Sequence, residues 1–270
     1  MAYTFCIANQ KGGVGKTTTA VNLAAALAVA ERRTLMVDCD PQGNATTGFG
    51  IDKQALSKTL YDGLIGVATA AELTVDGQVP FLRVIPARVE LIGFEVEMVD
   101  APDRELALKS LLRQVSADYD FILIDCPPSL SLLTINAMTA ADGLIIPLQC
   151  EFYALEGLSQ LMRTMNRVRQ RLNPALEIAG ILLTMFDKRT NLAAQVAEEA
   201  RKYFPDLVFQ TVVPRNVRLG EAPSFGKSII AYDAQSAGAQ SYLELAREIL
   251  QNGHRRRSVA EAAGKEPATS

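Results

Sequence analysis

The chain has 270 residues, of which 49% are hydrophobic, and its formal net charge is −3. This size and composition predict one α/β domain with a substantial core, and the slightly acidic balance excludes a protein that binds nucleic acid through a general basic field. Because no apolar stretch approaches the ~18 residues of a membrane span and a strand-like segment begins almost at the N-terminus, we expect a soluble protein without a signal peptide.

Seven short apolar segments bounded by turn residues are typical of buried strands. They span residues 3–9, 33–38, 81–87, 119–125, 143–149, 178–186 and 207–213. Helical periodicity fills most of the intervals, for example over 16–31 and 155–172, whereas 51–80 is less regular. This alternation predicts a mainly parallel, twisted β-sheet flanked by helices on both faces.

The first strand-like segment leads into QKGGVGKTTT, residues 10–19. A phosphate-binding loop of the usual kind reads G-x-x-x-x-G-K-[ST], with glycines that expose backbone N–H groups and a lysine that reaches the phosphates. In this chain Gln10 stands where the first glycine belongs, and a second lysine, Lys11, precedes the glycines. The strict pattern fails by one residue, and taken alone Lys11 is equally well explained as a solvated surface lysine.

We nevertheless expect this loop to wrap a phosphate chain at the N-terminus of the following helix. Lys16 supplies positive charge to the phosphates, and Thr17 supplies an oxygen ligand for Mg²⁺. The residues expected to contact the nucleotide here are Gly12, Gly13, Val14, Gly15, Lys16, Thr17 and Thr18.

Two later loops should reach the same edge of the sheet. Asp38 and Asp40 lie where strand 33–38 ends, and Asp125 ends strand 119–125. A carboxylate there can hold Mg²⁺ through water, and one nearer the γ-phosphate can orient an attacking water. We expect Asp40 and Asp125 to join Thr17 at the metal, whereas a strand-end cap explains Asp38 equally well.

The chain divides into one domain over residues 1–251 and a polar C-terminal tail over residues 252–270. The tail has no clear periodicity, and we expect it to be disordered. The basic segment HRRR at 254–257 lies in this tail. The four cysteines lie in or beside apolar segments and form no C-x-x-C pair. We therefore expect reduced, buried thiols in a cytoplasmic protein.

Four segments in order resemble motifs of one family. KGGVGKTT resembles the deviant Walker A loop of the ParA/MinD/Soj group of P-loop ATPases, and VDCDPQGNAT and LIDCPPSLSLLTINA resemble its switch I and switch II. PRNVRLGEAPSFGKSI at 214–229 resembles a C-terminal motif of the chromosomal and plasmid partition members. The resemblance covers residues 3 to about 250, is strongest to the short, Soj-like form of ParA, and implies a deviant P-loop NTPase fold.

The resemblance implies an ATPase that converts ATP and water to ADP and phosphate, with ATP and Mg²⁺ as cofactors and a weak basal activity. It implies that Lys11 reaches across a homodimer interface to the ATP of the partner subunit, the role of an arginine finger. The expected catalytic residues are therefore Lys11, Lys16 and Asp40. We also expect Met185 and Pro214 in the nucleotide site.

Partition members of the group are expected to bind nonspecific DNA as ATP dimers and to act with a ParB-like centromere-binding protein, which implies a nucleoid-associated location. The expected DNA-binding residues are Arg189, Arg215, Arg218 and Lys227. Arg163, Arg167 and Arg171 recur on one predicted helix face, for which a solvated surface is the simpler explanation. No helix-turn-helix precedes the loop, so operator-specific binding is not expected.

Proteins with related folds suggest alternative functions for this sequence. A MinD-like membrane cycler should end in a basic amphipathic helix with bulky apolar residues, but after Gly253 only Val259 is a branched apolar residue, so no membrane partner is expected. An iron–sulfur carrier like nitrogenase reductase needs suitably spaced cysteines, and no substrate loops of a dethiobiotin-synthetase-type ligase are recognisable. A ParA-like ATPase that positions another cargo, such as a chemoreceptor cluster, would carry the same motifs and stays open.

Overall fold

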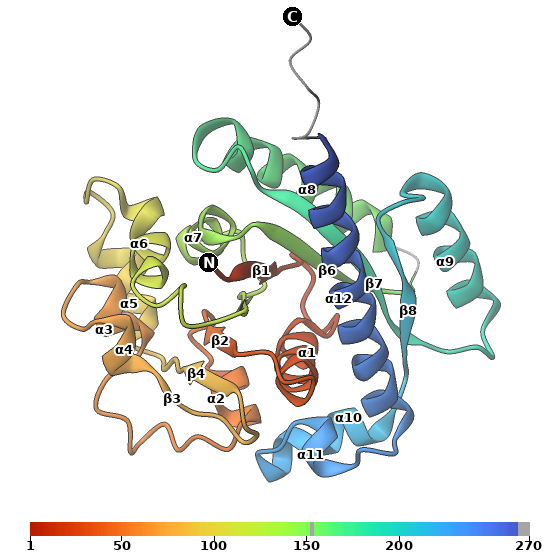
Figure 1. The fold of residues 1–270 in the computed structure, drawn as a ribbon, viewed down its shortest axis with the longest axis horizontal. Coiled ribbons are helices and arrows are strands. Elements are labelled where there is room, and N and C mark those ends of the chain that lie inside the picture. Colours follow the sequence, from red (N-terminus) through yellow and green to blue (C-terminus); the bar gives the residue numbers. More distant parts are fainter. Residues whose placement is uncertain (152–153, 264–270) are drawn as a thin grey trace, which may run out of the picture.

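The computed structural model describes residues 1–151 and 154–263. Within these residues one sheet has the strand order β3-β4-β2-β5-β1-β6-β7-β8 (Figure 1). The strands are β1 (Tyr3–Ile7), β2 (Thr34–Asp38), β3 (Val75–Asp76), β4 (Leu82–Ile85), β5 (Phe121–Asp125), β6 (Gly143–Gln149), β7 (Glu177–Phe186) and β8 (Val208–Pro214). Every neighbouring pair is parallel except β3 and β4. The loops that follow the parallel strands therefore share one edge of the sheet.

Helices fill most connections between these strands. The α-helices are α1 (Lys16–Val29), α2 (Asn44–Gly48), α3 (Leu60–Leu64), α4 (Ala70–Leu73), α5 (Leu91–Glu97), α6 (Ala107–Arg113), α7 (Leu132–Ala140), α8 (Ala154–Arg171), α9 (Asn191–Tyr203), α10 (Val217–Glu221), α11 (Ile229–Tyr232) and α12 (Ala237–Ala263). Two 3-10 segments are η1 (Arg104–Leu106) and η2 (Ala222–Phe225).

The sheet separates two apolar cores, because successive residues of a strand point to opposite faces. Along β1, Cys6 belongs to the core under α3 to α9, whereas Phe5 and Ile7 belong to the core under α1 and α12. Figure 1 shows α1 and α12 side by side over this second face. The expected architecture, a mainly parallel sheet with helices on both faces, is confirmed.

Helix α1 is buried from Thr19 to Ala28, and its alanines let it pack closely between the sheet and α12. The hydroxyl groups of Thr19 and Tyr242 lie 3.3 Å apart and connect α1 to α12. A helix that is apolar on all sides belongs in a protein interior. The loop before α1 is therefore attached to a rigid element.

All seven expected strands are present, and the structure adds β3, a two-residue strand in the region that looked irregular in sequence. Helix α12 continues to Ala263, so residues 252–263 are helical, although we expected the polar tail to begin at 252. Residues 264–270 and the side chains of HRRR at 254–257 lie outside the described part, and the division into domain and tail stays a prediction. The four cysteines are free and buried, as expected.

Candidate nucleotide site

Three loops meet at the carboxyl edge of the sheet, after the neighbouring strands β2, β5 and β1. The Cys39 N–H donates to the carbonyl oxygen of Asp125 at 2.9 Å, and the Cys126 N–H donates to that of Ile7 at 3.3 Å. Asp38 and Asp125 are also register partners across β2 and β5. The topology thus brings the glycine-rich loop and the two carboxylate loops into one site.

The glycine-rich loop has the backbone that its glycines permit. Gly13 and Gly15 have φ values of 73° and 89°, a region that residues with a Cβ rarely adopt. A Cβ placed on Gly12 or Gly13 would meet no described atom within 4 Å. The loop therefore presents open backbone at the start of α1, where a phosphate chain can lie against N–H groups. Thr17 and Thr18 are half-buried in the first turn.

Lys16 lies inside this loop. Its side chain is buried, and its Nζ donates to the carbonyl oxygen of Lys11 at 2.9 Å. Burial lowers the pKa of Lys16, while the charges of Asp125 and Asp40 oppose this change. The ammonium therefore stands where phosphates wrapped by the loop would need a positive charge.

Asp125 is the buried carboxylate of the site. Among the described residues, neither of its side-chain oxygens accepts a hydrogen bond. Burial raises the pKa of Asp125 well above its usual range, and the charge of Asp38 raises it further, whereas Thr17 and Lys16 lower it. An ionised carboxylate there needs a cation, and the oxygen donors of Thr17, Asp40 and Asp125 suit Mg²⁺ with its waters. The residues present therefore fit the expected metal.

Asp38 has a different set of contacts. It accepts hydrogen bonds from the Thr46 N–H at 2.8 Å, the Thr46 hydroxyl at 2.7 Å and the Asp40 N–H at 3.2 Å. Burial raises its pKa to about 6, and the bonds from Thr46 oppose the rise. Asp38 thus caps the strand and holds α2. Asp40, by contrast, accepts a hydrogen bond from the Gln42 N–H at 2.9 Å and is buried, at 7% exposure.

Lys11 lies at the rim of the site. Its Nζ is 2.7 Å from Oε2 of Glu151, in an ion pair whose side chains are 39% and 46% exposed. Its N–H donates to Oδ1 of Asn9, whose amide donates to the carbonyl of Pro147. The loop after β6 therefore holds Lys11 in place. Sequence reasoning missed Glu151, because the two residues are far apart in the chain.

The far side of the loop is formed by β7 and β8. The Thr184 hydroxyl donates to the carbonyl of Val14 at 2.9 Å, and the next residue, Met185, has a φ of 50°. Pro214 pairs with Phe186 in the adjacent strand, so the two expected nucleotide contacts lie at neighbouring strand ends. Close by in sequence, Oδ1 of Asn216 is buried without a hydrogen-bond partner among the described residues. We did not predict Asn216, although its position after a strand end was a usable signal.

The four expected DNA-binding residues are all exposed. Arg189 and Arg215 follow adjacent strands, and both lower the pKa of Asp187, chiefly through the hydrogen bonds from Arg189. Arg218 is paired with Glu221 at 2.9 Å and lies 3.7 Å from Asp233. The structure therefore brings Arg189 and Arg215 together beside Asp187, with which Arg189 is paired at 2.7 Å, and gives Arg218 two acidic neighbours of its own.

Lys227 stands apart from this group. It follows η2, beside Gly226, whose carbonyl accepts a hydrogen bond from Gln78 before β4.

On α8, the arginines are exposed, and Leu161, Met165 and Val168 are buried. This arrangement agrees with a solvated face for Arg163, Arg167 and Arg171.

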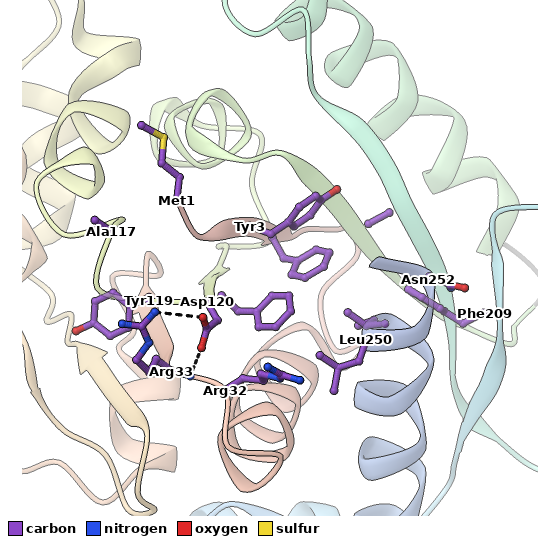
Figure 2. A pocket seen from close by; sticks show the side chains of 14 residues that line it. Met1, Tyr3, Arg32, Arg33, Ala117, Tyr119, Asp120, Phe209, Leu250 and Asn252 are labelled. Carbon is purple, nitrogen blue, oxygen red and sulfur yellow. Dashed lines mark hydrogen bonds and ion pairs between the residues drawn. The ribbon is translucent and has the colours of Figure 1, made fainter. Parts of the chain in front are cut away.

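A cavity of about 410 Å³ lies at the other end of the sheet (Figure 2). Tyr3, Phe5 and Phe121 line it from the strands, and Leu250 lines it from α12. Arg33, which follows α1, is paired with Asp120 at 3.3 Å. The amino ends of β1 and β5 border this cavity, so it is separate from the loops that form the nucleotide site.

A search of the described helices for a segment of the length and hydropathy that a membrane span requires finds none.

Several known proteins are similar to this chain in sequence and in fold. Residues 2–178 match the family described as an AAA domain. The chain is 58% identical to the chromosome partitioning protein ParA of Myxococcus xanthus (strain DK1622), over 91% of this chain and 87% of that protein. It is 56% identical to the sporulation initiation inhibitor protein Soj of Bacillus subtilis (strain 168), over 94% and 100%. The solved structure of cobyrinic acid a,c-diamide synthase from Mycobacterium smegmatis, with bound ADP and magnesium, has a TM-score of 0.83 at 36% identity, covering 94% of this chain and 96% of that chain.

Proposed function

Because the chain belongs to the ParA/Soj family of partitioning P-loop ATPases, we propose that it segregates DNA through an ATP-dependent cycle. ATP binding would assemble a sandwich homodimer, and the dimer would bind DNA without sequence preference. Slow hydrolysis, stimulated by a ParB-like centromere-binding partner, would return the protein to its starting state. A weak basal activity suits this cycle, because the bound state must last until the partner acts.

The observation that carries this proposal is the placement of the two lysines. Lys16 is buried inside the loop, whereas Lys11 is half exposed at the rim and is held by Glu151. A lysine at the rim can contact phosphates bound to a second molecule once the contact with Glu151 is broken. A cation supplied from the partner subunit stabilises charge on phosphoryl oxygens, as an arginine finger does. ATP would then hold the two subunits together.

Each of the other site residues has a role in ATP binding and hydrolysis. Lys16 and the loop N–H groups would hold the phosphates, and Met185 and Pro214 would border the base. Thr17, Asp40 and Asp125 would hold Mg²⁺, which when bound supplies positive charge to the phosphoryl oxygens. Asp40 would also orient the attacking water.

The DNA surface would combine Arg189, Arg215, Arg218 and Lys227 from both subunits. A two-fold dimer doubles a small basic patch, which makes DNA binding depend on ATP. The protein would then be cytoplasmic and nucleoid-associated. A ParA-like ATPase that positions another cargo has the same site, and the choice between cargoes depends on the partner protein.

The Asp40→Ala variant tests the proposed cycle. It should bind ATP, hydrolyse it far more slowly than the wild type, and accumulate as a dimer that retains unrelated DNA duplexes on a filter. Without ATP, or with ADP, neither protein should retain DNA. A monomeric Asp40→Ala protein at saturating ATP, or DNA binding that is the same with and without nucleotide, would contradict the proposal.

A further inference from the structure

Helix α5 is apolar on two opposite sides. Leu91 and Phe94 are fully buried against the core. Four exposed branched residues recur at spacings of three and four along this segment. Ile92 and Val96 lie on the outer side of α5, Val89 precedes the helix and Val99 follows it, and the exposures of Val89, Ile92, Val96 and Val99 are 62, 48, 70 and 54%. The Ile92 N–H donates to the carbonyl of Val89 at 3.0 Å, so the helical path already begins at Val89. We call these four residues the α5 stripe.

An outer apolar face of this kind is unusual for a surface helix, which normally exposes polar residues. Elsewhere in the described ranges, the large exposed hydrophobic residues are more dispersed, as Val29, Leu192 and Phe225 are. Scattered exposed apolar residues are ordinary, whereas a contiguous row on one helix face marks an interaction surface. Apolar residues spaced three and four positions apart form the side of an amphipathic helix that packs against a second helix.

The charge around the α5 stripe is negative. Residues 88–105 contain six carboxylates and two arginines, a net charge of −4. The most exposed carboxylates are Glu90, Glu97, Asp100 and Asp103. Arg88 is partly withdrawn from this surface, because its guanidinium donates to the carbonyl of Leu56 and lies 3.4 Å from Glu90. Charge complementarity therefore favours a basic occupant.

Helix α5 is also connected to α7, which follows one of the two carboxylate loops. Oε1 of Glu95 accepts a hydrogen bond from the Leu133 N–H at 3.3 Å. Leu133 lies in the first turn of α7, and the segment between Asp125 and this turn is the switch II loop. A molecule that binds α5 can therefore act on this loop through the first turn of α7, which Glu95 contacts directly.

We propose that the α5 stripe docks a positively charged amphipathic helix of the partner protein and that this contact is how the partner acts on switch II. The identity of the partner rests on the function proposed above. A second copy of this chain is a poorer occupant, because a two-fold contact would place the same carboxylates opposite one another.

Direct binding of a probe tests the surface independently of the function. The probe is a labelled synthetic peptide of about two heptads with leucine at the apolar positions and lysine elsewhere, and its matched control replaces lysine with glutamate. In fluorescence anisotropy the wild type should bind the lysine peptide at least about tenfold more tightly than the glutamate peptide. The double variant Ile92→Ser, Val96→Ser should lose about tenfold in affinity for the lysine peptide.

Leu192→Ser with Tyr203→Ser is the matched control, since both residues are exposed apolar side chains on α9; it should bind as the wild type does. Equal binding of the two peptides, or unchanged binding by the α5 double variant, would overturn the proposal. Loss of ATP-dependent dimerisation in the α5 double variant would also overturn it, because the stripe would then be a contact between copies of this chain.

The ATPase rate with DNA and the co-encoded ParB-like protein is the second measurement. The α5 double variant should keep its basal rate and lose stimulation, whereas the α9 control should keep both. Stimulation of the α5 double variant equal to that of the wild type would overturn the proposal. A wild type that no ParB-like protein stimulates would contradict the proposed function, and the peptide measurement would still decide whether α5 is a docking surface.

Discussion

Lys11 and Lys16 lie in one short loop but have different surroundings. Lys16 is buried and donates to the loop carbonyl of Lys11, whereas Nζ of Lys11 reaches outward to Glu151. The pair with Glu151 is largely solvated, and solvated ion pairs contribute only about 0–1 kcal/mol. Such a contact can be exchanged for a phosphate at little cost. For these single residues, we therefore propose that Lys16 binds ATP and that Lys11 takes part in dimer assembly.

Substituting each lysine separates these roles. Lys16→Ala should abolish ATP binding in calorimetry, because it removes the positive charge inside the loop. Lys11→Ala should bind ATP as a monomer, and in sedimentation it should neither dimerise nor hydrolyse the nucleotide. Dimerisation of Lys11→Ala equal to that of the wild type would exclude a role across the interface.

Asp38 gives a pH dependence of stability. The unfolded carboxyl ionises near 3.8 and the folded one near 6, so between these values the folded state keeps a proton that the unfolded state has lost. The free energy of unfolding should therefore fall as pH rises from about 4 to about 6 and then level off. With about 1.4 kcal/mol for each pKa unit, the fall is about 3 kcal/mol.

The comparison is with Asp38→Asn in urea unfolding at several pH values, without nucleotide or Mg²⁺. In the variant, the free energy of unfolding should fall less over this pH range, because the contribution of Asp38 is absent. This difference in pH dependence is expected even if the altered contacts with Thr46 change the absolute stability of the variant. Parallel pH profiles for the two proteins would show that Asp38 does not titrate in this range.

Among the elements, the packing of β7 against β8 depends on a glycine. Gly180 is paired with Ile145 of β6, next to a register shift at which Ala179 is left without a partner in β6. A Cβ on Gly180 would lie 2.3 Å from the ring of Phe209 in β8, which is itself buried. The aromatic ring thus occupies the space that a side chain at Gly180 would need.

Gly180→Ala should accordingly lower the free energy of unfolding by about 1–3 kcal/mol, the usual cost of overpacking a core. Gly157→Ala is the matched control, because no described atom lies within 4 Å of its added Cβ and the residue is within α8. That change should be neutral or should stabilise the helix by up to about 1 kcal/mol. Equal unfolding curves for the two variants would contradict the packing argument.

The elements that the sequence predicted correctly are those with a strong apolar signal. Each of the seven strands is an apolar segment next to turn residues; Asp125 ends one of them, β5, and Asp40 lies in the loop after β2. β3 could not be predicted, since two residues carry no periodicity. We did not predict that α12 continues beyond residue 251, because we took the polar composition there as a sign of disorder. A segment can be helical without an apolar face.

Contacts between distant parts of the chain were also beyond the sequence. The ion pair of Lys11 with Glu151 joins the loops after β1 and β6, and Arg218 in α10 lies 3.7 Å from Asp233, which follows α11. Such pairs depend on strand order and side-chain direction, which a single sequence does not specify. The roles of the site residues stay predictions, although the structure brings together those around the glycine-rich loop.

At the scale of the whole molecule, DNA binding should depend on dimerisation. If Arg215 and Arg218 of both subunits each neutralise a phosphate, about four counterions are released, and log K should fall with log salt at a slope of about −3.6. Arg218→Ala should reduce the slope to about −1.8, with similar weakening for unrelated sequences, because phosphate contacts carry no sequence information. Filter binding over a range of salt concentrations measures both.

The pair between Arg218 and Glu221 provides a matched variant. Glu221→Gln removes a competing carboxylate and should strengthen DNA binding, while Arg218→Ala weakens it. An unchanged slope in Arg218→Ala would place the DNA surface elsewhere, with Arg163, Arg167 and Arg171 on α8 as the next residues to substitute.

We propose that this chain partitions DNA and that a partner protein accelerates its slow ATP hydrolysis. The most direct test is the steady-state ATPase rate of the purified protein alone, with nonspecific DNA, with the co-encoded ParB-like protein, and with both. We expect a low rate that rises strongly only when DNA and the ParB-like protein are present together. A rate that responds to neither, alone or in combination, would contradict it.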